Sequence, residues 1–237
     1  TGTTTRPGPA IASATGAAAG NLTVGTTSGT WVYVVGDSQI TGGPGCSPTT
    51  YLGQTGVGCT RTDPTTKFGA ITVNLSSSTE AVQAALSYPL NTGATQFTLG
   101  SGDDSFEVDG THDSGALVTV LGGNGADTLT GDSQNDTFDG QGGDDTLRGA
   151  GGNDTLRGGP GNDTFVSEST TDGADSIDGG SDAPAAGDFD DPGDSLRYAN
   201  RSSALAVTLP ADSVVTPGGS NGAAGEGDKI ARIENVA

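Results

Sequence analysis

The chain has 237 residues, 42 of them glycine, with 31% hydrophobic residues and a formal net charge of −20 at pH 7. Such an acidic chain is repelled by phosphate backbones, which opposes nucleic-acid binding. The single histidine, His112, provides neither a His-based triad nor a zinc site, and no apolar run approaches the length of a transmembrane helix. We therefore expect a protein that is not an enzyme and has no membrane-spanning segment.

The N-terminal stretch, residues 1–98, is rich in Thr, Gly, Ala and Ser and carries few charges. Four segments in it have the composition of β-strands: 21–24, 30–35, 71–75 and 95–99. The first two are separated by a glycine-containing turn and predict a strand pair. Ser77-Ser-Thr-Glu80 forms a capping box before residues 81–86, which predicts one short helix. We expect residues 1–98 to form a β-rich cap, because repeat arrays need their ends covered.

The two cysteines, Cys46 and Cys59, lie in a stretch rich in Gly, Pro and Thr and would close a ring of 14 residues. Their spacing is unlike that of a CxxC redox or metal motif, and the chain has no further cysteine. We expect a disulfide, which would stabilise the fold by roughly 3 kcal/mol. Disulfides persist in oxidising compartments, so we expect a secreted, extracellular or cell-surface protein. The sequence contains no Met, as expected of a processed, secreted chain.

From Gly122 to Val166 a nine-residue unit repeats five times without a gap: GGNGADTLT, GDSQNDTFD, GQGGDDTLR, GAGGNDTLR and GGPGNDTFV. A fixed short period of this kind decides the architecture. Each unit has a Gly-rich turn of six residues closed by Asp, then a strand of three residues with one large apolar residue. The aspartates are Asp127, Asp136, Asp145, Asp154 and Asp163, and the apolar residues are Leu129, Phe138, Leu147, Leu156 and Phe165. Because side chains alternate along a strand, the apolar residue faces inward.

The turns have the chemistry of a calcium site. Glycine reaches positive φ at little steric cost, so a Gly-rich turn can point several carbonyl oxygens inward, and the Asp adds a carboxylate. Hard oxygens suit Ca²⁺, which takes six to eight of them, whereas Mg²⁺ fits worse. Two units make one coil, so turns 18 residues apart stack, with Asp127, Asp145 and Asp163 on one edge and Asp136 and Asp154 on the other. One apolar residue per unit gives a core too thin to close without the metal.

This pattern, G-G-x-G-x-D-x-U-x, resembles the RTX (repeats-in-toxin, hemolysin-type calcium-binding) family. The resemblance implies an all-β fold, a right-handed parallel β-roll or β-helix solenoid that binds several Ca²⁺ ions. One turn would supply its Asp carboxylate and alternate carbonyls, and the next turn the intervening carbonyls. On this chain the carbonyl ligands would come from residues such as Gly123, Gly125, Gly142, Gly143, Gly151, Gly152, Gly159 and Gly161.

The second unit departs from the family pattern, with Asp132 and Gln134 where glycine is expected. Its site is either weaker than the others or gains Asp132 as an extra ligand.

Less regular units flank the clean run. Upstream, residues 100–106 form one more unit with Asp104, followed by a bulging segment with His112 and a strand at 117–120. Downstream, Asp175 keeps the motif after a three-residue slip of phase, and residues 192–196 form a degenerate turn. We expect the calcium-binding roll to span residues 99–198. Residues 199–237 resemble a segment that interrupts RTX arrays, and we expect a solenoid extension or cap there.

The whole negative charge lies on the repeat region. Residues 99–196 hold 22 acidic and two basic residues, a net charge of −20, and the rest of the chain is neutral overall. Such an array repels itself unless counter-charge is bound. A disordered acidic segment would have a similar composition, but fixed spacing of both the Asp and the apolar residue argues against it.

Three uses of such a roll remain open. The favoured one is a secreted structural protein, a calcium-stiffened component of a surface, matrix or filament that binds Ca²⁺ and associates with copies of itself. The alternative is a calcium-dependent folding or secretion module of a larger exoenzyme, toxin or adhesin. Ice binding through the outward threonine row is a weaker third option, because threonine is common at that position in RTX rolls. The threonines are Thr128, Thr137, Thr146, Thr155 and Thr164.

Overall fold

The computed structural model describes residues 10–15, 20–27, 31–36, 39–42, 46–51, 54–60, 71–74, 80–85, 95–108, 117–167, 173–180, 194–198, 229–231 and 235–236. Every regular element in these ranges is a β-strand. The described part of the chain therefore offers no helix of the length and apolarity needed to span a membrane.

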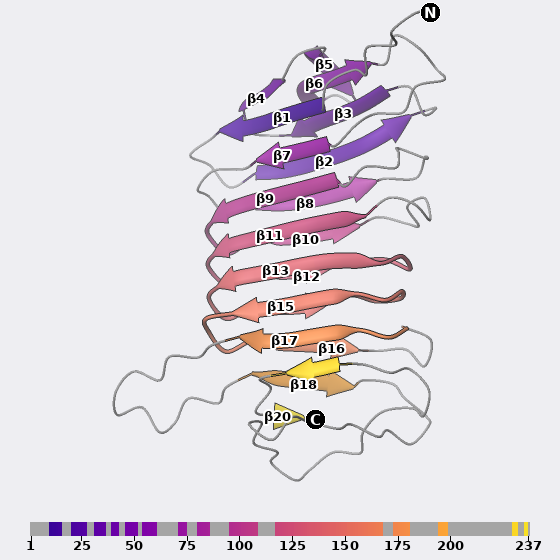
Figure 1. The fold of residues 1–237 in the computed structure, drawn as a ribbon. Coiled ribbons are helices and arrows are strands. Elements are labelled where there is room, and N and C mark those ends of the chain that lie inside the picture. Colours follow the sequence, from indigo (N-terminus) through magenta and orange to yellow (C-terminus); the bar gives the residue numbers. More distant parts are fainter. Residues whose placement is uncertain are drawn as a thin grey trace, which may run out of the picture.

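The strands form two sheets that run side by side along one axis (Figure 1). Sheet A contains β1 (Ala10–Thr15), β4 (Gln39–Gly42), β7 (Ile71–Asn74), β9 (Thr95–Ser101), β11 (Val118–Asn124), β13 (Asp136–Gly142), β15 (Thr155–Gly159), β17 (Ser176–Gly180) and β19 (Lys229–Ala231). Sheet B contains β2 (Gly20–Thr27), β3 (Trp31–Gly36), β5 (Cys46–Tyr51), β6 (Gln54–Thr60), β8 (Glu80–Ala85), β10 (Ser105–Val108), β12 (Thr128–Thr130), β14 (Thr146–Arg148), β16 (Thr164–Ser167), β18 (Ser195–Tyr198) and β20 (Asn235–Val236).

From β7 onward, successive strands alternate between the sheets, and each pairs in parallel with the strand one coil away. In Figure 1 the strands of sheet A run leftward in front, those of sheet B return behind, and the chain descends from N to C. This path is a right-handed coil, so the predicted all-β parallel solenoid is confirmed. We call the turns leading from sheet A to sheet B, such as 122–127, 140–145 and 158–163, the first edge. The turns from sheet B to sheet A, such as 131–136 and 149–154, form the second edge.

The core consists of apolar side chains from both sheets, one from the middle of each short strand. Leu129, Leu147 and Phe165 point inward from sheet B, and Phe138 and Leu156 point inward from sheet A, none more than 3% exposed. The inward position repeats because neighbours on a strand face opposite sides. Toward the N-terminal end the core also contains two aromatic rings in contact, those of Phe97 and Phe106, whose centroids lie 4.8 Å apart.

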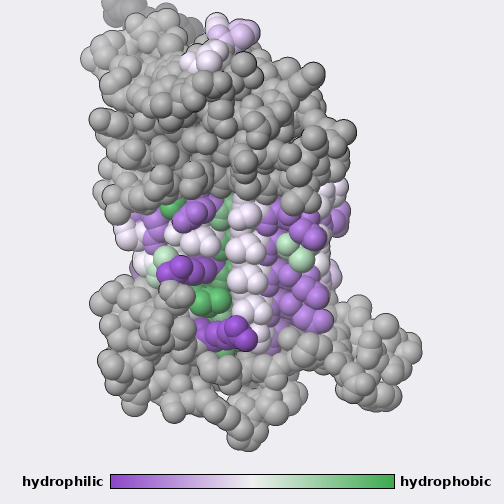
Figure 2. All heavy atoms as spheres, turned by 180° about the vertical axis from the view of Figure 1, so that it is seen from behind, coloured by the Kyte–Doolittle hydropathy of each residue, from purple (hydrophilic) through white to green (hydrophobic). Residues whose placement is uncertain are grey.

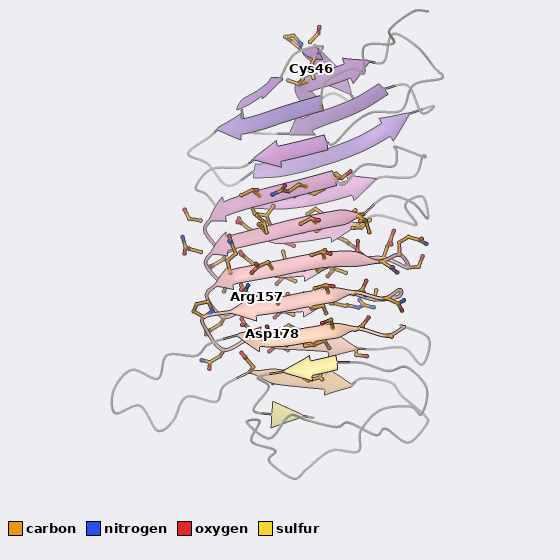
Figure 3. The ribbon with its side chains drawn as sticks, in the orientation of Figure 1. Cys46, Arg157 and Asp178 are labelled. Carbon is orange, nitrogen blue, oxygen red and sulfur yellow. The ribbon has the colours of Figure 1, made fainter. Side chains whose placement is uncertain are left out.

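The outward faces of the roll are polar. Figure 2 shows the rear face, where a column of near-neutral residues runs down the middle, hydrophilic residues lie on both sides, and hydrophobic residues are visible beside the column. On sheet A, the strand register places Arg157 of β15 directly between Asp139 of β13 and Asp178 of β17 (Figure 3). The basic side chain therefore lies between two acidic ones on an otherwise acidic roll.

At the N-terminal end the parallel ladders change to antiparallel pairing. Strand β2 pairs with β3, with Val24 opposite Val34, so the predicted strand pair is confirmed. Strands β7 and β9 pair in parallel, as the solenoid strands predicted at 71–75 and 95–99 require. The expected boundary between the N-terminal cap and the roll, between residues 98 and 99, falls within strand β9. Both sheets continue across this position.

The short helix predicted over residues 81–86 is wrong, because Glu80–Ala85 is strand β8. This strand pairs in parallel with β2 on one side and with β10 on the other. Backbone hydrogen bonding on both sides outweighs the modest helix propensity of its alanines, since tertiary context routinely overrides propensity.

Strands β5 and β6 form a hairpin at the same end, and their register places Cys46 directly opposite Cys59. Cys46 lies at the N-terminal end of the molecule in Figure 3, far along the axis from the tandem repeats. No cysteine among the described residues is free.

Candidate metal centre

A column of five buried aspartates runs down the first edge: Asp104, Asp127, Asp145, Asp163 and Asp194. The carboxylates of the last four reach back to the coil before them. Oδ1 of Asp127 accepts the backbone N–H of Asp104 at 2.8 Å, and Oδ1 of Asp145 accepts that of Asp127 at 2.8 Å. The same bond joins Asp145 to Asp163 at 2.9 Å and Asp163 to Asp194 at 2.8 Å.

A second column of three buried aspartates, Asp136, Asp154 and Asp175, follows the other edge. Oδ1 of Asp154 accepts the N–H of Asp136 at 2.8 Å, and Oδ1 of Asp175 accepts that of Asp154 at 2.9 Å. The two edges stack as the 18-residue spacing predicts. The seven aspartates predicted as ligands therefore lie in two columns.

The columns keep their register where coils are longer than 18 residues. Asp104 and Asp127 are 23 residues apart, Asp154 and Asp175 are 21 apart, and Asp163 and Asp194 are 31 apart, yet each pair makes the same bond. The predicted three-residue slip before Asp175 is confirmed. His112 and the bulging segment lie outside the described residues. Coil length therefore varies while the position of the aspartate does not.

The second carboxylate oxygen has a different environment from the first. Oδ2 of Asp127 and Oδ2 of Asp145 are buried and accept no hydrogen bond. Burial raises the pKa of Asp127 from 3.8 to about 6, against the lowering effect of the backbone hydrogen bond with Asp104, and nearby Asp103 raises it further. Burial likewise raises the pKa of Asp145 to about 7, although its backbone hydrogen bond with Asp127 lowers it. A buried carboxylate without counter-charge is costly, and a cation beside Oδ2 would remove that cost.

The first glycine of each unit makes room for this oxygen. A Cβ on Gly122 would collide with Oδ2 of Asp127 and would lie 2.7 Å from the carbonyl oxygen of Gly140 in the next coil. A Cβ on Gly140 would collide with Oδ2 of Asp145 in the same way. A carboxylate oxygen and a carbonyl oxygen thus face one small space that glycine leaves open. These are the hard oxygen donors that Ca²⁺ prefers, so the residues present fit the ion.

The described residues bring together no group of three or more His, Cys, Asp or Glu side chains that could hold a metal. A calcium site here would combine the one buried carboxylate of a turn with backbone carbonyl oxygens. The predicted carbonyl donors lie in the turns of both edges, on the first edge at Gly123, Gly125, Gly142, Gly143, Gly159 and Gly161, and on the second at Gly151 and Gly152. This arrangement matches the one carboxylate per turn that the sequence offers.

A second ladder lies one residue before each aspartate, on the outside of the turns. Oδ1 of Asp144 accepts the N–H of Asn162 at 3.0 Å on the first edge. On the second edge, Oδ1 of Asn135 accepts the N–H of Asn153 at 2.8 Å. The acidic side chains of this ladder lie close to the buried column, and Asp144 contributes to the raised pKa of Asp145. The outer ladder thus adds negative charge to the edge.

Sequence reasoning missed two parts of the site. Asp194 is absent from the predicted ligand set, although it is 1% exposed and continues the first-edge column. Its signal was visible in the degenerate turn at 192–196, which places Asp194 before a polar and an apolar residue. The glycine at the first position of every unit is the second omission, and it could have been found because that position never varies.

Comparison with protein families identifies the repeat. Residues 119–147 and 139–172 match the model of the RTX calcium-binding nonapeptide repeat (4 copies). This stretch of the chain consists of RTX repeats. No curated protein and no solved structure matches the chain. The family match and the parallel solenoid both support a calcium-binding β-roll in this part of the chain.

Proposed function

We propose that the RTX roll holds a row of Ca²⁺ ions along its edges, and that binding them completes and stiffens the fold. The observation that carries this proposal is the pair of buried Oδ2 atoms of Asp127 and Asp145, which accept no hydrogen bond. Each would gain a divalent counter-charge at the place where burial now raises its pKa.

The ligands of the first edge would be the carboxylates of Asp127, Asp145 and Asp163 with turn carbonyls such as those of Gly123 and Gly143. Asp104 and Asp194 would extend that row. On the second edge, Asp154 and Asp175 would act with carbonyls such as those of Gly151 and Gly152. The ions would supply positive charge to a stretch whose net charge is −20.

We infer that the protein works outside the cell as a structural component. The proposal gives it no catalytic role. Extracellular calcium modules typically bind Ca²⁺ at about 10⁻⁴–10⁻³ M. The roll would therefore be incompletely folded inside the cell and would complete its fold after export. Cys46 and Cys59 are Cα partners in the register of β5 and β6, which would suit a disulfide in an oxidising compartment. A rod stiffened by calcium is suited to a surface, matrix or filament made of copies of itself.

Circular dichroism tests the coupling of calcium to folding. The protein is stripped with a chelator and titrated with CaCl₂ up to millimolar concentration, with MgCl₂ as the control. We expect the β signal to rise with Ca²⁺ and to change little with Mg²⁺. An equally strong β signal in excess chelator, with no response to Ca²⁺, would refute the coupling.

Negative-stain microscopy tests the structural role separately. Samples with Ca²⁺ and with a chelator are compared at equal protein concentration. Filaments or sheets in Ca²⁺ alone are expected. Monomers under both conditions would remove self-association from the proposal and favour the alternative, a calcium-dependent module of a larger exoenzyme, toxin or adhesin.

A further inference from the structure

The turn at 131–136 differs in backbone conformation from the other turns of the tandem run. Each of the other four turns places two residues at positive φ: Gly123 and Gly125, Gln141 and Gly143, Ala150 and Gly152, and Gly159 and Gly161. No residue of the fully described turn 131–136 has a positive φ. Asp132 and Gln134 occupy the two equivalent positions in this turn. Its peptide groups therefore point in other directions than those of its neighbours.

Hydrogen bonds within this turn stabilise a backbone conformation without residues at positive φ. Oδ1 of Asp132 accepts the backbone N–H of Gln134 at 2.8 Å, which ties the turn to itself. The backbone N–H of Asp132 donates to Oδ2 of Asp136 at 3.2 Å. This oxygen is the counterpart of the Oδ2 atoms of Asp127 and Asp145, which accept no hydrogen bond, whereas in Asp136 the buried oxygen that accepts none is Oδ1. A Cβ on Gly131 would collide with Oδ2 of Asp136 and with the carbonyl oxygen of Gly149, as at the other first glycines. The difference in this turn is that the N–H of Asp132 already donates to Oδ2.

The neighbouring coil also changes at this point. The register pairs Asp136 with Val118 of the preceding coil, and Val118 with Thr95 of the coil before that. Both partners are buried, Val118 at 0% and Thr95 at 2% exposed. Asp136 is therefore the first aspartate of its column, and the coil before it presents no carboxylate at the equivalent position.

We propose that the turn 131–136 is a metal-free closing turn, which ends the calcium row of the second edge so that its first ion lies beyond Asp136, toward Asp154. The inference rests on the proposed calcium function. Asp132 then stabilises the turn by accepting the N–H of Gln134, and it is not a calcium ligand. The calcium row of this edge would then be preceded by a turn that folds without an ion.

Counting bound ions tests the proposal, by native mass spectrometry of the full chain in Ca²⁺ and by calorimetric titration. The matched pair is Asp136→Asn and Asp145→Asn, which remove one carboxylate from the second and from the first edge. We expect Asp145→Asn to lose at least one ion and Asp136→Asn to keep the wild-type number. Equal loss in both variants would overturn the proposal.

Two further variants address the turn directly. The double change Asp132→Gly with Gln134→Gly restores the repeat pattern and should add one bound ion. Asp132→Asn keeps an oxygen acceptor for the N–H of Gln134 and should leave the number unchanged. An unchanged count in the double variant, or a lost ion in Asp132→Asn, would contradict the inference. If the wild type binds no ion in millimolar Ca²⁺, the proposed function itself fails, which is a distinguishable result.

Discussion

The two edges of the roll use the same nine-residue unit but carry aspartate over different lengths. On the first edge the buried column extends from Asp104 to Asp194. On the second edge it begins at Asp136, and the coils before it place Val118 and Thr95 at the equivalent position. The coil itself continues unchanged across that point, since β9, β11 and β13 remain paired. Strand pairing therefore sustains the solenoid, whereas turn composition decides where an edge can take metal.

The largest expected effect is a change in the stability of the calcium-free protein with pH, caused by the buried aspartates of the first edge. The pKa values of Asp127 and Asp145 are raised from 3.8 to about 6 and about 7 in the folded protein without calcium. Groups with raised folded pKa values stabilise the fold below their unfolded pKa, and this stability is lost as the pH rises through the folded values. A tenfold difference in proton affinity between the folded and unfolded chain corresponds to about 1.4 kcal/mol, which solvent screening reduces. Calcium-free protein should thus unfold at lower temperature at pH 8 than at pH 4.

Calcium reverses this dependence, because the ion competes with the proton for the same carboxylates. Calcium affinity should therefore rise between pH 5 and pH 8. Melting curves in chelator and calcium titrations across this range provide the measurement. A calcium-free roll whose stability increases from pH 4 to pH 8 would contradict the environment described for Asp127 and Asp145.

The next effect tests the backbone stacking that both edges share. Gly143 and Gly152 have φ values of 129° and 119°, and a Cβ on either would collide with a carbonyl oxygen of the preceding coil. Changing either residue to alanine should lower the free energy of unfolding by about 3 kcal/mol or more, through left-handed strain and the clash.

The neighbouring glycines are matched controls for this pair. A Cβ on Gly142 would lie 3.6 Å from its nearest neighbour, Oδ1 of Asn124, and one on Gly151 would lie 3.4 Å from Cα of Ser133. Alanine at either control position should change stability by no more than about 0.5 kcal/mol. Denaturant unfolding in saturating Ca²⁺ compares the four variants, and equal losses in all of them would argue against the stacking.

The smallest effect is a gain in stability. Gln141 on the first edge and Ala150 on the second have φ values of 78° and 74°, a region that L residues other than glycine rarely adopt. Glycine at either position relieves about 1–2 kcal/mol of strain and costs about 0.5–1 kcal/mol of backbone entropy. Each variant should therefore be more stable by about 0.5 kcal/mol, or about 1–2 °C in Tm. A lower Tm in both would show that these side chains contribute contacts that outweigh the strain.

The repeat region was predictable because one period encodes both the turn and the core. The spacing of Asp127, Asp145 and Asp163 in the sequence corresponds directly to their hydrogen bonds. Asp194 was harder to place, since 31 residues separate it from its partner Asp163, and length alone does not reveal that the chain returns to register.

The N-terminal region was less predictable, because its strands depend on partners distant in sequence. Glu80–Ala85 has a local helix signal, but it pairs with Gly20–Thr27 and with Ser105–Val108, which no local pattern can show. The departure of the second unit was visible as Asp132 and Gln134. Its consequence was not, because the outcome depends on which donor reaches Oδ2 of Asp136.

The most direct test of the calcium rows is anomalous scattering from crystals grown in Ca²⁺. Peaks should follow the two edges, next to Oδ2 of Asp127 and Asp145 on the first edge and beyond Asp154 on the second. The turn at 131–136 should show none. Crystals of the folded roll in millimolar Ca²⁺ without peaks beside these carboxylates, or with ions bound elsewhere only, would contradict the account.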